Sequence, residues 1–225
     1  MPRLARSSLG GICYHVVDRG NARATVYHDE QDYAAFLQLI RRACEEVPMR
    51  VLAFCLMPNH LHFVLWPLAD GDLGRWMHWL LTTHVHGHHK RHRTSGHIWQ
   101  GRYKAFPIQQ DHHLLAVLRY VERNALRARL VERAEHWPWS SVRWWGRRSR
   151  PEFLVSGPVA HPSDWILRVN EPVTDAELEA VRLSVRRSRP FGAEKWVKET
   201  AKALGMESTL RDPGRPRGVQ RDSGE

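Results

Sequence analysis

The chain has 225 residues, 42% of them hydrophobic, and a formal net charge of +10. This length is sufficient for one sizeable domain with appendages, and the sequence contains no apolar run long enough to span a bilayer. The charge therefore favours a polyanionic partner, and among polyanions nucleic acid rather than a membrane. The alternative is a basic protein that has no such partner.

The sequence has three cysteines, Cys13, Cys44 and Cys55, an odd number without C-x-x-C spacing. The N-terminal residues lack the apolar core of a secretory signal. Both observations indicate a reducing compartment, so we expect a cytoplasmic protein.

From the N-terminus, the hydrophobic pattern predicts four strands and two helices. The strands are predicted at residues 12–17, 51–57, 60–66 and 103–108. Asp29 and Asp72 are candidate N-caps of the two helices, because apolar residues follow each of them at helical spacing. The resulting order, βαββαβ, is typical of an α+β fold of the ferredoxin-like or RRM-like kind, with an antiparallel sheet and helices on one face.

Two histidines begin the third predicted strand. Because side chains alternate along a strand, His60 and His62 should point to one face and Leu61, Phe63 and Leu65 to the other. A pair of imidazoles in this geometry is half of a metal site. The alternative is two hydrogen-bonded histidines of a sheet, because the spacing alone is a weak signal.

A further helix is predicted over residues 114–131. Its apolar positions recur at helical spacing, at Leu114, Val117, Leu118, Val121 and Ala125. Tyr120 and Asn124 are four residues apart, so they lie one turn from each other at the edge of this apolar stripe. If the stripe packs on the core, we expect a tyrosine hydroxyl and an amide oxygen to approach the histidine strand.

Residues 82–93 are rich in histidine and basic residues. His88 and His92 have helical spacing and could bind a metal. A basic face near DNA, or a solvated helix end, is the simpler interpretation of this run.

After residue 136, tryptophans and arginines are interleaved. They are Trp137, Trp139, Arg143, Trp144, Trp145, Arg147, Arg148 and Arg150. Such a segment can stack on bases and neutralise phosphates, or it can form a tryptophan-rich cap over the core with a solvated arginine run.

Near the C-terminus, the capping box that starts at Thr174 predicts a helix, and a second helix is predicted to end at Gly205. The remaining residues, 206–225, are rich in Gly, Pro, Arg and Asp and are predicted to be a flexible tail. The sequence Gly-Arg-Pro-Arg at 214–217 resembles the core of an AT-hook, although a disordered basic end is the simpler interpretation.

Taken together, these motifs resemble the His-hydrophobe-His (HUH) single-tyrosine transposases of the insertion-sequence type, and more narrowly the REP-associated tyrosine transposases. The resemblance rests on residues 14–21, 56–62, 96–104, 119–124, 137–141, 190–192 and 209–211. It implies an HUH catalytic domain at 1–136, a Trp/Arg-rich segment with C-terminal helices at 137–205 and the flexible basic tail at 206–225. One departure is Ala125, where the family usually has proline, and we expect it to leave the helix longer or straighter.

The resemblance also implies a substrate and a reaction. The substrate would be single-stranded DNA with hairpins of repetitive extragenic palindromes (REP elements), in a bacterial, nucleoid-associated setting. Tyr120 would form a 5′-phosphotyrosine intermediate during cleavage and rejoining. Residues of the matching motifs are the candidates for DNA contact: Arg19, Asn21, Arg23, Gln100, Arg102 and Lys104, with Arg123 and Arg127 extending the face of Tyr120. Whether the chain acts as a monomer or a homodimer is left open.

Phosphodiester transesterification explains why these residue types belong together. A tyrosine hydroxyl has a pKa of about 10 and is a poor nucleophile at neutral pH, so the phosphate must be made electrophilic. A divalent cation held by His60, His62 and the amide oxygen of Asn124 would do this. Mg²⁺ or Mn²⁺ suits turnover, and the nitrogen ligands would also accept Zn²⁺, Ni²⁺ or Co²⁺.

Two rival functions remain at this point. The first is a DNA-binding regulator of palindromic repeats that keeps the fold and lacks catalysis. The second is an RNA-binding ferredoxin-like module, which would place stacking aromatic residues on the sheet face where this sequence has histidines.

Overall fold

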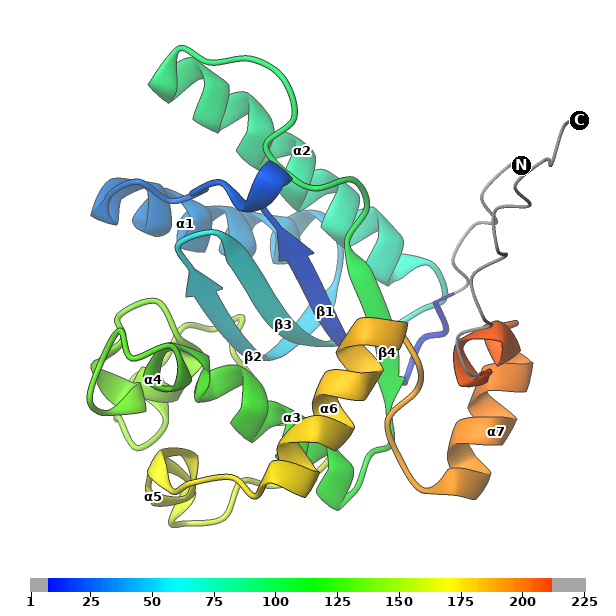
Figure 1. Ribbon diagram of the computed structural model, residues 1–225. Helices are drawn as coiled ribbons and strands as arrows, with labels where there is room; N and C mark the ends of the chain where they lie inside the picture. Colours follow the sequence, from blue (N-terminus) through cyan, green and yellow to red (C-terminus); the bar gives the residue numbers. More distant parts are fainter. Residues whose placement is uncertain (1–7, 212–225) are drawn as a thin grey trace, which may run out of the picture.

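The computed structural model describes residues 8–211 (Figure 1). The strands are β1 (Cys13–Arg19), β2 (Met49–Met57), β3 (His60–Pro67) and β4 (Lys104–Ile108). The α-helices are α1 (Glu30–Glu46), α2 (Asp72–His92), α3 (His112–Glu122), α4 (Asn124–Arg127), α5 (Trp165–Asn170), α6 (Asp175–Arg187) and α7 (Glu194–Ala203). Short 3-10 helices are η1 (Asn21–Arg23), η2 (Ala134–His136), η3 (Ser141–Trp144) and η4 (Glu207–Leu210).

The four strands form one antiparallel sheet in the order β2-β3-β1-β4. This arrangement confirms the predicted ferredoxin-like βαββαβ pattern, with element boundaries that differ from the prediction by a few residues. The register of the two central strands places Val17 opposite His62 and Arg19 opposite His60. The histidine strand is therefore flanked on both sides by other strands, which fixes the direction of its side chains.

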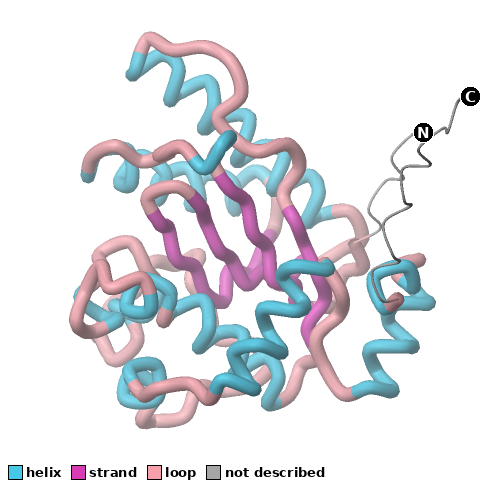
Figure 2. Tube along the Cα trace, in the orientation of Figure 1, coloured by secondary structure: helices cyan, strands magenta, loops and turns pink. Residues whose placement is uncertain are grey.

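Helices cover both faces of the sheet, in different roles (Figures 1 and 2). The helices α1 and α2 cover one face, where Phe63 packs edge-on against Trp76 at a ring-centroid distance of 5.4 Å. The opposite face carries His60 and His62, and α3 packs over it against β2, β3 and β4. The predicted apolar stripe of the tyrosine helix is buried, so this added helix is the cover of the histidine face.

The tyrosine helix is shorter than predicted, and the expectation of a longer or straighter helix was wrong. It ends at Glu122, and a separate turn of helix, α4, begins at Asn124. Glu122 is fully buried, and its carboxylate accepts hydrogen bonds from Ser141, Trp145 and Trp165. These tertiary contacts fix the position of Glu122 at the end of α3. The periodicity of apolar residues along the helix does not predict them.

Two of the three predicted helix N-caps are confirmed, and one is not. The Asp29 side chain accepts a hydrogen bond from the backbone N–H of Asp32, as expected of an N-cap, and that of Thr174 accepts from Glu177. Asp72 is the first residue of α2 and not its cap; its carboxylate accepts from the backbone N–H of Ala69.

The tryptophans after residue 136 pack along the outer edge of β2. Trp137 donates its indole N–H to the carbonyl of Leu56, whose own N–H donates to the carbonyl of Trp139. Trp139 stacks on Tyr33 with ring centroids 4.9 Å apart. These contacts support the interpretation of a cap over the core, because the segment covers a sheet edge that would otherwise be unpaired.

One cluster of buried apolar residues extends from Cys13 to Val169 and so crosses the predicted boundary at residue 136. The division of the chain into three parts stays a prediction. The AT-hook-like sequence at 214–217 and most of the predicted tail lie outside the described residues.

Candidate active site

The two histidines of β3 lie side by side on the α3 face of the sheet, with ring centroids 5.2 Å apart. Each ring is held through its Nδ1 atom. His60 Nδ1 is 2.8 Å from Oδ1 of Asn59, and His62 Nδ1 is 2.8 Å from Nε2 of His15. Because a ligand histidine binds a metal through one nitrogen and hydrogen-bonds through the other, Nε2 is the atom through which either ring could bind a metal.

His15 is a third histidine of the site that the sequence analysis did not single out. It lies on β1, is fully buried, and stacks on His62 with a centroid distance of 5.1 Å. Its Nδ1 atom has no hydrogen-bond partner among the described residues. The only sequence signal was a polar residue in an apolar strand, because the pairing of this strand with β3 is decided by the tertiary fold.

Burial keeps these imidazoles neutral. Desolvation, with a smaller contribution from nearby arginines, lowers the pKa of His60 to about 4 and that of His15 to about 3. The same causes, with the neighbouring histidines, lower the pKa of His62 well below its ordinary value. Neutral imidazole is the form that binds a metal, so the three rings are in the protonation state that a metal site needs at neutral pH.

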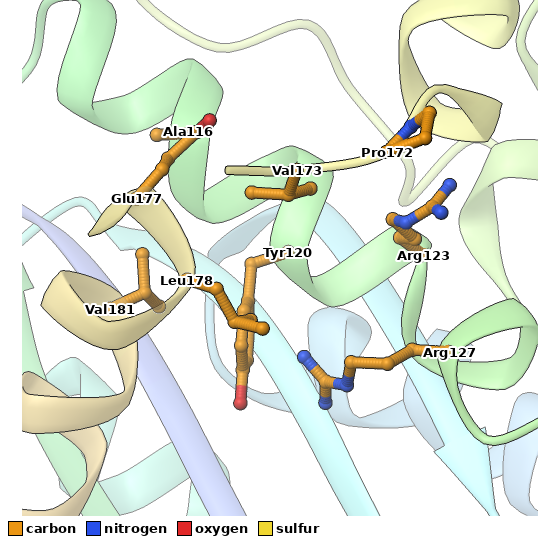
Figure 3. A pocket seen from close by; sticks show the side chains of 9 residues that line it. All are labelled: Ala116, Tyr120, Arg123, Arg127, Pro172, Val173, Glu177, Leu178 and Val181. Carbon is orange, nitrogen blue, oxygen red and sulfur yellow. The ribbon is translucent and has the colours of Figure 1, made fainter. Parts of the chain in front are cut away.

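Tyr120 reaches the histidines from α3. Its ring centroid is 5.9 Å from that of His62 and 5.8 Å from that of His15, both with edge-on geometry. The predicted proximity of Tyr120 to the histidine strand is therefore confirmed. The guanidinium of Arg127 lies over the tyrosine ring, 4.3 Å from its centroid (Figure 3).

Asn124 follows the break in the helix and is buried. Its Oδ1 atom accepts a hydrogen bond of 3.0 Å from Arg127, and its Nδ2 has no partner among the described residues. The helical turn that it begins, α4, packs against β2, whose Cys55 pairs with His62 across the sheet. Asn124 thus begins a helical turn that rests on the strand beside the histidines.

The two arginines of the tyrosine face differ in their surroundings. Arg127 lies beside Tyr120 and Asn124. The guanidinium of Arg123 instead donates to the carbonyls of Val169 and Asn170, at 2.7 and 2.6 Å, and so caps the C-terminus of α5. Arg123 has a structural partner in the described chain, and its role as a phosphate binder stays a prediction.

Half of the eight predicted DNA contacts line one groove. A cavity of about 430 Å³ is lined by Val17, Asp18, Arg19, Gln100, Arg102, Lys104, Val185 and Arg186. Four of these are predicted contacts, and Arg186 of α6 is an added cation that the sequence analysis did not include. Of the four predicted contacts outside the groove, Asn21 and Arg23 lie in η1 directly after β1, where the carbonyl of Arg23 accepts from the side chain of Asn59.

Within the described residues, one further group of side chains could hold a metal ion as they stand: Asp111, His112 and His113. It lies at the N-terminal end of α3, whereas Tyr120 lies near the C-terminal end. Asp111 is the N-cap of α3 and accepts hydrogen bonds from the backbone and the ring of His113. This group is separate from the histidines of the sheet.

A ferredoxin-like sheet with a His-hydrophobe-His strand, faced by a tyrosine from an added helix, defines the class of HUH single-tyrosine DNA enzymes. Residues 8–124 match the family model described as "Transposase IS200 like". The chain therefore belongs to the IS200-like transposase family, whose members are single-tyrosine transposases.

Two known proteins are similar to this chain. A protein of Haemophilus influenzae described as a REP-associated tyrosine transposase is 27% identical over 146 residues, covering 59% of this chain and 80% of that protein. The solved structure of a REP-associated tyrosine transposase bound to a REP hairpin has a TM-score of 0.55 at 19% identity, covering 78% of this chain and all of that one.

Among the described residues, no helix is long and apolar enough to cross a membrane.

Proposed function

We propose that this transposase cleaves and rejoins single-stranded DNA with Tyr120 as the nucleophile. The observation that supports this most is the contact of the Tyr120 ring with His62 and His15 on the sheet. The tyrosine oxygen would attack the scissile phosphorus, forming a phosphotyrosine bond to the 5′ side and releasing the 3′ oxygen as a hydroxyl. The reverse attack by a 3′-hydroxyl would rejoin the strands and return the tyrosine.

We further propose that His60, His62 and Asn124 bind a divalent cation, Mg²⁺ or Mn²⁺. Three features fit this assignment: both imidazoles are neutral, both are oriented through Nδ1, and Asn124 is buried at the start of the turn that packs beside them. Arg127 now holds the amide oxygen of Asn124, so metal binding requires either its second lone pair or a shift of Arg127. When bound, the cation would polarise a nonbridging phosphate oxygen.

The groove of Arg19, Gln100, Arg102 and Lys104 is the proposed path of the DNA strand. It opens beside the end of β1, where Arg19 pairs with His60, so a strand in the groove would lead to the histidines. The transposase solved with a REP hairpin has the same fold, which supports a palindromic hairpin as the substrate of this chain as well. Because Tyr120 faces the histidines of its own chain, we propose that a monomer suffices for cleavage.

The proposal is tested by incubating the protein with Mn²⁺ and labelled single-stranded hairpins from extragenic palindromes of its own genome. A covalent protein–DNA band on a denaturing gel is expected, and it should vanish with EDTA or in the Tyr120→Phe variant. That variant should still bind the hairpin, since only a hydroxyl is removed. Tight binding without cleavage by the unmodified protein would instead support a catalytically silent DNA-binding regulator, and an adduct formed by Tyr120→Phe would exclude Tyr120 as the nucleophile.

A further inference from the structure

A second cluster of histidines lies on the other side of the molecule's sheet, between α1 and α2. Two turns of α2 contribute His88 and His92, and the loop before α1 contributes His28. The three rings are mutual neighbours: centroid distances are 4.5 Å between His88 and His92, 4.9 Å between His28 and His92, and 5.6 Å between His28 and His88. The site described above uses none of these residues.

His88 has no partner for either ring nitrogen among the described residues, although only 8% of its surface is exposed. A buried polar atom without a partner costs about 1–3 kcal/mol, so such a side chain requires an explanation. Burial also lowers the pKa of His88, which keeps the ring neutral and its lone pair available. An imidazole in this state, beside two others, is typical of a metal ligand.

A carboxylate orients the cluster. Asp32 of α1 lies 2.9 Å from Nε2 of His92 and accepts a hydrogen bond from the backbone N–H of His28. With Nε2 of His92 engaged, its Nδ1 is the atom available to a cation, which is the carboxylate–histidine–metal arrangement. The same carboxylate also pairs with Arg91, so Asp32 orients His92 and does not itself bind the cation.

We propose that His28, His88 and His92 bind one transition-metal cation of the Zn²⁺, Co²⁺ or Ni²⁺ class, with Asp32 orienting His92. Three imidazoles select these cations over Mg²⁺ and Mn²⁺, which prefer oxygen ligands. The ligand nitrogens do not yet converge to within 4.8 Å of one another in this structure, so binding requires a side-chain rotation. The exposed ring of His28 can make that rotation without disturbing the core.

A cation here would have a structural consequence. It would join the loop between η1 and α1 to the C-terminal end of α2. That loop follows Arg23, whose carbonyl is bound by Asn59, the residue that also orients His60. The metal would thus hold a segment that connects a proposed DNA contact with a proposed catalytic ligand.

The test uses the full chain carrying His60→Ala, His62→Ala and Asn124→Ala, so that none of the three proposed ligands of the catalytic centre remains. Co²⁺ is titrated into the untagged protein while its visible d–d absorption and the bound stoichiometry are measured, and Zn²⁺ is then added as a competitor. We expect one Co²⁺ per chain, displaced by Zn²⁺, and a rise in the melting temperature with either ion.

Single substitutions in the same background locate the site. His28→Ala removes an exposed ring and should weaken Co²⁺ binding at least tenfold without affecting the fold; His88→Ala should do the same, with circular dichroism to check folding. Asp32→Asn should weaken binding about tenfold through the orientation of His92. His86→Ala is the matched control, because His86 lies on the exposed face of the same helix, and it should bind as before.

A double variant, His112→Ala with His113→Ala, tests the other group of metal ligands and should leave binding unchanged. The inference is overturned if the triple-substituted protein binds no Co²⁺, if His28→Ala and His88→Ala bind it equally well, or if only the double variant loses it. Each result is independent of DNA cleavage, so failure of this inference does not affect the proposed function.

Discussion

His15 and His62 share a buried hydrogen bond of 2.8 Å between Nε2 of the first and Nδ1 of the second. The bond joins two neighbouring strands on the face that Tyr120 covers. When Nε2 of His62 binds a cation, its Nδ1 carries the proton and donates to His15. In the proposed mechanism His15 would therefore be a positioning residue, which sets the tautomer and the orientation of a proposed metal ligand.

The first prediction concerns this bond. His15→Phe keeps an aromatic ring in the sheet and removes the acceptor, so metal affinity should fall about 10–100-fold, as is usual for such outer partners. The rate of adduct formation should then require a higher Mn²⁺ concentration to saturate, while the rate at saturation changes less. His15→Gln, which retains an acceptor, should recover part of the affinity. An unchanged Mn²⁺ dependence in His15→Phe would show that the bond does not position the ligand.

The second prediction concerns the pH dependence of stability. Desolvation raises the pKa of buried Glu122 to about 7, against the opposing effect of its three hydrogen-bond donors. Because the folded pKa exceeds the unfolded value of 4.5, the contribution of Glu122 is fully present below pH 4.5 and is lost as the pH rises through 7. Glu122→Gln removes this titration. The unfolding free energy of the native protein relative to that variant should therefore fall by about 2 kcal/mol between pH 5 and 8.

Urea unfolding of both proteins at the two pH values measures this difference. The other titrating groups are common to both proteins and cancel in the comparison. A difference that stays constant with pH would mean that Glu122 does not change its protonation in this range.

The third prediction separates stability from DNA contact at Arg123. Its two hydrogen bonds to the carbonyls at the end of α5 involve a charged donor, so Arg123→Ala should lower the unfolding free energy by about 1.5–3 kcal/mol. The control is Arg129→Ala, at an exposed position two residues beyond Arg127. This variant should have the same unfolding free energy as the unmodified protein. If Arg123→Ala instead leaves stability intact and weakens hairpin binding, its role as a phosphate contact is the correct one.

The fourth prediction concerns the groove. Arg102→Ala and Lys104→Ala should each weaken hairpin binding and reduce the slope of log K against log salt by about 0.7, the value per phosphate contact on single-stranded DNA. Binding measured at several salt concentrations gives this slope directly. Arg41→Ala, on the exposed side of α1, should leave it unchanged, because that arginine pairs with Glu45 away from the groove. A loss of affinity with an unchanged slope would contradict the proposed phosphate contacts.

Local patterns were sufficient for much of the fold and part of the site. The βαββαβ order follows from hydrophobic periodicity and turn residues, which act over a few neighbours in the chain. The common face of His60 and His62 follows from the alternation of side chains along one strand. The approach of Tyr120 follows from the buried stripe of its own helix. Each of these predictions depends on contacts within a single element or between adjacent ones.

The rest was decided by contacts between residues distant in the sequence. His15 joins the site because β1 pairs with β3, 47 positions away in the chain, and no local pattern encodes that pairing. The helix break after Glu122 depends on donors that lie 19 to 43 residues further on. The sequence by itself therefore determined the elements and the chemistry of the principal residues. Only the tertiary structure decided which side chains orient them, because burial and hydrogen-bond partners exist only after the elements have packed.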